Sequence, residues 1–238
     1  MFYDLHSHLT NPLFDNDRAE IIKKCKAGGI SVVLCGLDFD DNVNCLNLAM
    51  DGLFACFGMH PTMKFDDKII GQIEEFKDKI IGIGEVGLDF KKGVSTSQMS
   101  NFKKIISLAE RLNKPLIVHS RMAEKEVSEI VGSVSVPVVL HAFFGSKKIV
   151  ETLLSFKNVF FSIPSSVFYD AQLQELVKLV PLDRLFCETD SPFLWKFGRN
   201  SPLNVVKSYE AISRVKNVDL AVVEREIASN FSKVFLKR

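Results

Sequence analysis

The sequence predicts an α/β fold, a (β/α)8 TIM barrel that forms a single domain over residues 1–238. The length of 238 residues suits one such barrel, which takes about 200–250 residues. Eight short apolar segments alternate with segments of helical pattern along the chain. Histidines and acidic residues gather where the apolar segments end, and barrel enzymes carry their chemistry at the carboxyl ends of their strands.

The eight apolar segments are expected to form the strands. They cover residues 2–6, 30–36, 53–59, 80–86, 115–119, 137–141, 158–163 and 184–189. Most are continuous apolar runs, which suits a parallel sheet covered on both faces, and parallel strands need crossover connections that are usually helical. A doubly wound open sheet is the alternative. The closed barrel is favoured because it gathers the polar strand ends into one ring, whereas an open sheet spreads them along a line.

The clearest helix is predicted over residues 95–113, where apolar residues recur at steps of three and four and form one stripe. Ser95 or a neighbouring hydroxyl residue can cap its start, and Pro115 follows its end. Further helices are predicted over 15–29, which ends in two glycines, over 170–180, which Pro181 stops, and over 219–238.

The overall composition limits the classes of function. Hydrophobic residues make up 47% of the chain, and the formal net charge is only +1, which argues against broad binding of polyanions. Five cysteines without a CxxC pair indicate reduced thiols in an intracellular protein. We find neither a signal-peptide pattern nor an apolar run long enough to cross a membrane. We therefore expect a cytoplasmic protein with no membrane contact, and no obligate protein partner is evident.

The opening segment contains an HxH pair, His6 and His8, in the first predicted strand. Residues two apart in a strand point to the same side, so both imidazoles can reach one metal ion. Two packed or surface histidines are the alternative, and the position at the end of a barrel strand favours the metal.

Other strand ends supply more candidate metal ligands. Glu85 lies among apolar residues and glycines, where a charged carboxylate needs a strong partner such as a metal. His119 and His141 end consecutive strands, and Asp190 ends the last strand, which in a barrel lies beside the first. Six candidates are too many for one tetrahedral zinc and suit two divalent ions that share a carboxylate. Histidine-rich sites suit Zn²⁺, whereas phosphoryl transfer often uses Mg²⁺ or Mn²⁺.

Taken in order, several motifs resemble those of the TatD family of metal-dependent deoxyribonucleases. They are DLHSHL at the start, GMHP at 58–61, GEVGLDF at 84–90, Gln98 and Phe102 ahead of LAERLNKPLIVHSR, LHAFFGS at 140–146, ETDSPFL at 188–194, RNSP at 199–202 and Asn230–Phe231. The match covers nearly the whole chain, and the ordered set is far more specific than any one motif. Three departures, at Thr10, at Lys103–Lys104 and in the FFGS loop, remove no candidate ligand but affect segments that can set substrate preference.

The resemblance implies a barrel hydrolase of the wider amidohydrolase-like superfamily that cleaves phosphodiester bonds in DNA, from an end of the strand. It implies that one ion is surrounded by His6, His8, Glu85 and Asp190, and the other by Glu85, His119 and His141. Asp190 would also orient or deprotonate the attacking water, which makes Glu85 and Asp190 the expected catalytic residues. The expected partner is DNA, short or single-stranded, as the substrate.

Three further residues are candidates for substrate binding. His60 of GMHP can contact a substrate phosphate, or it can be a packed or capping histidine. Arg121 and Arg199 can pair with phosphate, because guanidinium binds it through two hydrogen bonds, or they can form structural ion pairs.

A different amidohydrolase-like barrel enzyme, acting on a small amide, ester or phosphoester, is the alternative function. Many such enzymes place a carboxylated lysine at the end of the fourth strand. Glu85 at that position favours the nuclease, and the presence of all six candidate ligands argues against a barrel without catalytic activity.

Overall fold

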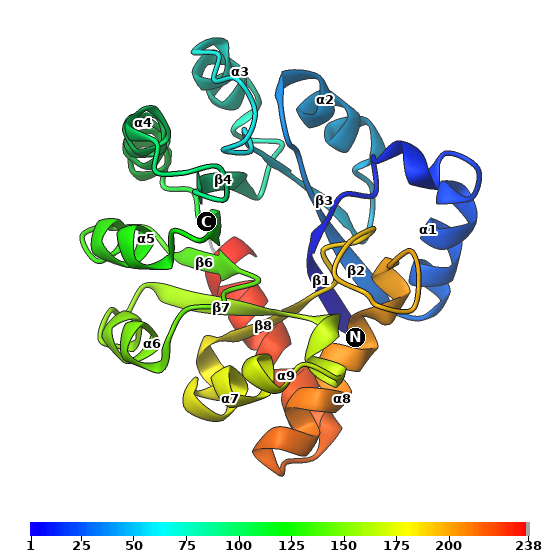
Figure 1. Ribbon diagram of the computed structural model, residues 1–238. Helices are drawn as coiled ribbons and strands as arrows, with labels where there is room; N and C mark the ends of the chain where they lie inside the picture. The colour runs from blue at the N-terminus through cyan, green and yellow to red at the C-terminus, as the bar shows by residue number, and fades with distance from the viewer. Residues whose placement is uncertain (237–238) are drawn as a thin grey trace.

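The computed structural model describes residues 1–236 and shows the predicted barrel (Figure 1). Eight strands form one sheet in the order β1 to β8, and the neighbouring pairs from β1–β2 to β7–β8 are all parallel. The strands are β1 (Phe2–Ser7), β2 (Ile30–Cys35), β3 (Leu53–Phe57), β4 (Gly82–Asp89), β5 (Leu116–Arg121), β6 (Val138–His141), β7 (Val159–Pro164) and β8 (Leu185–Glu188). The open-sheet alternative is therefore wrong.

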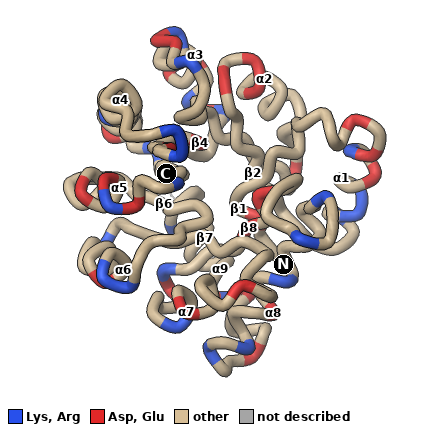
Figure 2. Tube along the Cα trace, viewed as in Figure 1, with Lys and Arg blue, Asp and Glu red and all other residues tan. Residues whose placement is uncertain are grey.

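Helices follow the strands and form the outer layer of the barrel (Figure 1). They are α1 (Arg18–Ala27), α2 (Phe39–Leu48), α3 (Lys68–Phe76), α4 (Thr96–Leu112), α5 (Glu124–Val131), α6 (Lys147–Leu154), α7 (Ala171–Leu179), α8 (Val205–Lys216) and α9 (Leu220–Phe231). Lysine and arginine are interspersed with acidic residues over these helices and their loops (Figure 2). Among the described residues, no helix has the length and apolar character needed to span a bilayer.

The long helix α4 follows the sequence prediction closely. The Ser95 side chain accepts a hydrogen bond from the Gln98 backbone N–H and caps the start. At the other end Asn113 adopts a left-handed conformation with φ 50°, which stops the helix ahead of Pro115. The predicted final helix over 219–238 is partly wrong, because the α-helix ends at Phe231 and continues as a π-helix over Ser232–Leu236. Residues 237–238 lie outside the described part.

Three strand limits differ from the prediction in a way that matters for the site. β4 and β5 extend to Asp89 and Arg121, because Val86–Asp89 pair with Val118–Arg121 after an irregularity in the ladder. Glu85 and the His119 side chain therefore project from within strands rather than from their ends. β8 stops at Glu188, so Asp190 lies two residues beyond it.

The two ends of the barrel differ in chemistry. Phe235 approaches Gly82, the first residue of β4, and its ring lies 5.9 Å from that of Phe186 on β8. The C-terminal segment therefore closes the amino end of the barrel with apolar side chains. The histidines and acids lie toward the opposite end, where barrel enzymes carry their active sites.

Candidate metal centre

The barrel closes through backbone hydrogen bonds between β1 and the segment after β8. The Asp190 N–H donates to the His6 carbonyl at 2.9 Å, and the His8 N–H donates to the Ser191 carbonyl at 2.8 Å. These bonds place Asp190 directly beside the HxH pair. The seam that completes the barrel therefore also assembles part of the site, as predicted from the neighbouring positions of the first and last strands.

Four donor atoms meet at this seam. The Nε2 atoms of His6 and His8 lie 3.1 Å apart. They lie 3.3 and 3.4 Å from Glu85 Oε2, and 3.7 and 3.4 Å from Asp190 Oδ1. Ligand atoms that bind one ion at about 2.0–2.2 Å are roughly 3–3.5 Å from one another. The spacing at the seam is therefore close to that of a single coordination sphere.

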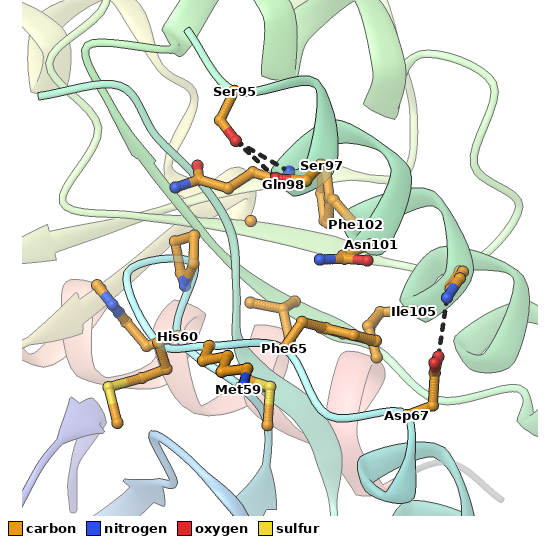
Figure 3. Close-up of a pocket in the computed structure, with 16 residues that line it drawn as sticks. Met59, His60, Phe65, Asp67, Ser95, Ser97, Gln98, Asn101, Phe102 and Ile105 are labelled. Atoms are coloured by element: carbon orange, nitrogen blue, oxygen red, sulfur yellow. Dashed lines mark hydrogen bonds and ion pairs between the residues drawn. The ribbon is translucent and has the colours of Figure 1, made fainter. Parts of the chain in front are cut away.

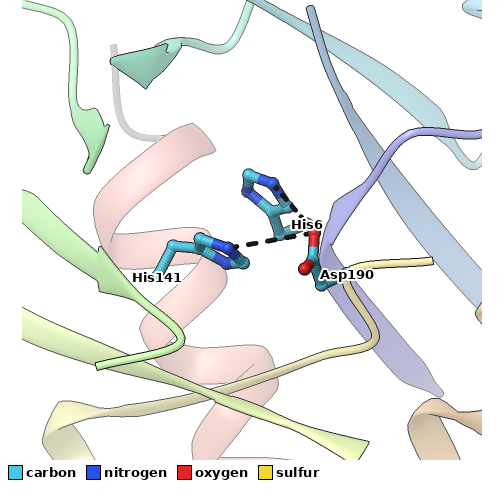
Figure 4. A group of neighbouring side chains, drawn as sticks. All are labelled: His6, His141 and Asp190. Atoms are coloured by element: carbon cyan, nitrogen blue, oxygen red, sulfur yellow. Dashed lines mark ion pairs between the residues drawn. The ribbon is translucent and has the colours of Figure 1, made fainter. Parts of the chain in front are cut away.

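The other oxygen of Glu85 faces a different set of imidazoles. Glu85 Oε1 lies 2.8 Å from His119 Nδ1 and 4.0 Å from His141 Nε2. His141 also approaches Asp190 Oδ1 at 3.9 Å, and its ring stacks on that of His6 with centroids 3.7 Å apart (Figure 4). Glu85 thus stands between two groups of donors, with one oxygen directed at each.

The two acids are buried and ionised. Burial alone would raise the pKa of Glu85, but His6, His119 and His8 hold the pKa of this carboxyl well below its usual range. Burial likewise opposes ionisation of Asp190, and His141 and His8 outweigh it and lower the pKa of that carboxyl. Two buried negative charges at the centre of a histidine cluster are the donor set that a divalent cation requires.

The outer nitrogens of three histidines have partners that orient the rings. His8 Nδ1 donates to the Cys35 carbonyl at 3.0 Å, His119 Nε2 donates to Asp89 Oδ2 at 3.1 Å, and His141 Nδ1 lies 2.8 Å from Glu188 Oε1. Histidines that bind metals usually have such a carbonyl or carboxylate on the second nitrogen, because it fixes the tautomer and directs the free nitrogen at the ion. The residues present therefore fit a metal centre.

Two glycines allow the strands to approach closely enough around Glu85. A Cβ atom on Gly58, between β3 and His60, would lie 2.4 Å from the Glu85 backbone nitrogen. Gly87 has φ +137°, and a Cβ atom there would lie 2.1 Å from the His119 carbonyl oxygen. A side chain at Gly58 would push the segment after β3 away from Glu85, and a side chain at Gly87 would push β4 away from His119.

Comparison with known proteins identifies the family. The model of the TatD related DNase family matches residues 3–236. The chain belongs to this family. It is 31% identical to an uncharacterized metal-dependent hydrolase of Methanocaldococcus jannaschii, covering 100% of this chain and 98% of that protein. It is 32% identical to human deoxyribonuclease TATDN3 (98% and 94% covered) and 26% identical to the 3'-5' ssDNA/RNA exonuclease TatD of Cronobacter sakazakii (99% and 98% covered).

Solved structures of TatD proteins share the fold over the full length. A TatD homologue from Escherichia coli superimposes with a TM-score of 0.89 at 20% identity, covering 100% of this chain and 98% of the other. A TatD family hydrolase from Entamoeba histolytica gives 0.85 at 19% identity, covering 98% and 97%. The barrel predicted from the sequence is confirmed.

The three substrate-binding candidates occupy different surroundings in this TatD protein. His60 Nε2 lies 3.6 Å from Glu85 Oε1, and its Nδ1 contacts the Thr62 hydroxyl at 2.6 Å. Arg121 donates from Nε to Asp89 Oδ2 at 2.7 Å, while its side chain is 48% exposed and lines a cavity with His119, His141 and Asp190. Both residues therefore border the cluster.

Arg199 is held away from the cluster by its own partners. Its guanidinium forms an ion pair with Asp17, donates to the Leu13 carbonyl and lies over the Phe14 ring at 4.6 Å. These contacts match the structural ion pair that was the alternative for this residue. A phosphate contact from Arg199 would require the Asp17 pair to open.

Three buried acids that support the site were not predicted from the sequence. Asp4 accepts hydrogen bonds from the Thr189 N–H at 2.8 Å and from the Thr189 hydroxyl at 2.6 Å, which fastens β1 to the segment beyond β8. Asp89 and Glu188 contact the outer nitrogens of His119 and His141. A signal was present for Asp4, because it precedes His6 and His8 at steps of two and so shares their side of the strand.

Proposed function

We propose that this TatD protein is a metal-dependent deoxyribonuclease that hydrolyses phosphodiester bonds of short or single-stranded DNA from an end. The arrangement of Glu85 supports this most strongly, since its Oε2 lies near His6 and His8 whereas its Oε1 lies near His119 and His141. Named relatives include deoxyribonucleases and a 3'-5' exonuclease. The low net charge suits contact with a few nucleotides rather than with a long duplex.

The residues that would hold two divalent ions are those predicted from the sequence. His6, His8, Glu85 and Asp190 would hold one ion, and Glu85, His119 and His141 the other. Bound there, Mg²⁺, Mn²⁺ or Zn²⁺ would acidify a water molecule and neutralise charge that develops on the phosphate.

The protein's own groups supply the remaining chemistry. Asp190 is ionised, so its carboxylate can accept a proton from the attacking water and orient that water toward phosphorus. Arg121 is placed to donate to a non-bridging phosphate oxygen, because its exposed guanidinium borders the same cavity as Asp190.

His60 would act as a neutral group. Burial lowers its pKa to about 4, so at pH 7 the ring can hydrogen-bond a phosphate or water but carries no positive charge. We therefore propose that His60 contacts a substrate phosphate through a hydrogen bond and not through a positive charge. A cytoplasmic location is part of the same proposal, since all five cysteines are buried free thiols.

The test is cleavage of end-labelled single-stranded DNA by metal-stripped protein and by the same protein restored with Mg²⁺, Mn²⁺ or Zn²⁺. We expect cleavage only after restoration, shortening from one end, and loss of cleavage in Glu85→Ala and Asp190→Asn. Equal cleavage by wild type and both variants would refute the assignment. Restored protein that leaves DNA intact but hydrolyses small amides or esters would favour the alternative barrel hydrolase.

A further inference from the structure

A cavity of about 530 Å³ adjoins the metal centre on the side of β3 and β4. It lies between α4 and the segment that follows β3, and His60 separates it from the Glu85 cluster (Figure 3). Its volume falls within the range of about 300–1,000 Å³ that is usual for small-molecule sites. A ligand group in this cavity would therefore lie next to the reacting centre.

The cavity walls combine flat and adaptable apolar surfaces. Phe102 and Ile105 of α4 are buried and form one wall, and Met59 and Phe65 lie across from them (Figure 3). Aromatic faces and methionine sulfur pack well against planar rings. This lining suits a nucleobase better than a phosphate or a bare sugar.

Two side-chain amides of α4 add hydrogen-bonding groups. The Asn101 side chain makes no hydrogen bond within residues 1–236, and Figure 3 shows it projecting from α4 toward the segment that carries Met59 and Phe65. Gln98 accepts the Asp89 N–H at 2.9 Å through Oε1, which leaves its NH₂ group as a donor. Because the two residues are three apart, they share one face of the helix. An amide offers both donors and an acceptor, as does the edge of a base.

Two lysines line the cavity, and one of them can bind a phosphate attached to the ligand. Lys104 is neutralised by Asp67 at 2.8 Å, whereas Lys64 has no acidic partner within the described residues. Lys64 can therefore interact with a further phosphate of a strand that leaves the cavity.

A second cavity, of about 360 Å³, adjoins the cluster from the side of β5 and β6, where His119, His141 and Asp190 border it. The donor cluster thus lies between two cavities. A phosphodiester has the same layout, because its phosphate lies between two nucleosides.

We propose that the larger cavity is a nucleoside subsite, which binds the base and sugar attached to one side of the scissile phosphate, with Asn101 hydrogen-bonding the base edge. This inference rests on the proposed nuclease function and specifies how the cavity beside the metal centre binds part of the DNA substrate.

Equilibrium binding to the metal-restored protein tests the subsite without relying on turnover. Isothermal titration with thymidine 3'- and 5'-monophosphate, compared with inorganic phosphate, gives the affinity that the nucleoside adds. We expect at least one of the two nucleotides to bind wild type more tightly than phosphate. Asn101→Leu, which keeps side-chain volume but removes the amide, should reduce the ratio of nucleotide affinity to phosphate affinity about tenfold. Asn101→Trp, which fills the cavity, should abolish it.

Ser100→Ala is the matched control, since Ser100 is an exposed neighbour on the same helix, and its ratio should equal that of wild type. An unchanged ratio in both Asn101 variants, or a wild type that binds phosphate as tightly as either nucleotide, would overturn the subsite. DNA cleavage by the same preparations separates the two proposals. If wild type cleaves DNA but the Asn101 variants keep the wild-type ratio of nucleotide to phosphate affinity, only the subsite is contradicted. If wild type has no phosphodiesterase activity, the proposed function is contradicted.

Discussion

The β1–β8 seam and the β4–β5 pair both supply donors to the candidate metal centre, but they differ in burial and in how they are held. At the seam, the His6 and His8 side chains are 0% and 4% exposed, and backbone hydrogen bonds fasten them to Asp190 and Ser191. In the β4–β5 pair, the His119 side chain is 14% exposed and Arg121 is 48% exposed, and both are tied to Asp89.

The difference in burial between the seam and the β4–β5 pair suits them to two different roles in the site. The closed seam is suited to retaining a cation, because its ligands cannot move without opening the barrel. The β4–β5 pair opens toward the cavities on either side and is suited to receiving a substrate. Glu85 belongs to both, since it projects from β4 and reaches the seam histidines.

Substitution of the shared residue should have the largest effect. In Glu85→Gln both groups of donors lose their common negative charge, so we expect kcat on single-stranded DNA to fall by about 10³-fold or more. Bound metal, measured by inductively coupled plasma mass spectrometry after gel filtration, should fall with it. Retention of full metal content and activity would show that Glu85 does not join the two groups.

Asp190→Asn should affect chemistry more than metal retention. The variant loses the proton acceptor while His6, His8 and Glu85 remain, so we expect kcat to fall by about 10²–10⁴-fold with metal content close to that of wild type. Asp183→Asn, an exposed residue ahead of β8, is the control and should match wild type. A normal kcat in Asp190→Asn would remove this residue from the proposed mechanism.

Glu188→Gln and Asp89→Asn test the acids that orient His141 and His119. Each substitution keeps the shape of the side chain and removes its charge, so metal affinity should weaken by about 10–100-fold, as for other outer partners of metal-binding histidines. Competition with a chromogenic chelator measures this affinity. Affinity equal to wild type in both variants would mean that the ring orientations do not depend on these carboxylates.

The smallest effects are expected at the two arginines. Arg121→Ala should raise KM for DNA about tenfold, because a charged hydrogen bond to phosphate is lost. Arg199→Ala should change KM by less than about twofold, since its guanidinium is paired with Asp17 and is not among the groups that line the cavity beside Arg121. Steady-state kinetics of both variants measures the two changes in KM. A larger increase in KM for Arg199→Ala than for Arg121→Ala would show that the Asp17 pair opens for substrate.

The barrel and the main donor set could be predicted from the sequence because both follow from local patterns. Apolar runs mark parallel strands, and steps of two place His6 and His8 on one side of β1. The closure of β8 on β1, which brings Asp190 to the HxH pair, follows from barrel topology alone.

Other features depend on tertiary contacts that no local pattern reveals. Glu188 lies within a predicted strand, and Asp89 lies three residues beyond the predicted end of another. Each resembles any acid near a strand end until His141 and His119 are placed against them. The pairing of Arg199 with Asp17 joins segments 182 positions apart in the chain. The extension of β4 beyond Glu85 depends on Gly87, whose positive φ allows the strand to continue beside His119.

Anomalous diffraction from a crystal soaked in Mn²⁺ tests the central claim most directly. We expect two peaks that share Glu85, one bounded also by His6, His8 and Asp190, and the other by His119 and His141. A map without a peak in contact with Glu85, or with a single ion held by one group of histidines alone, would contradict the two-ion centre.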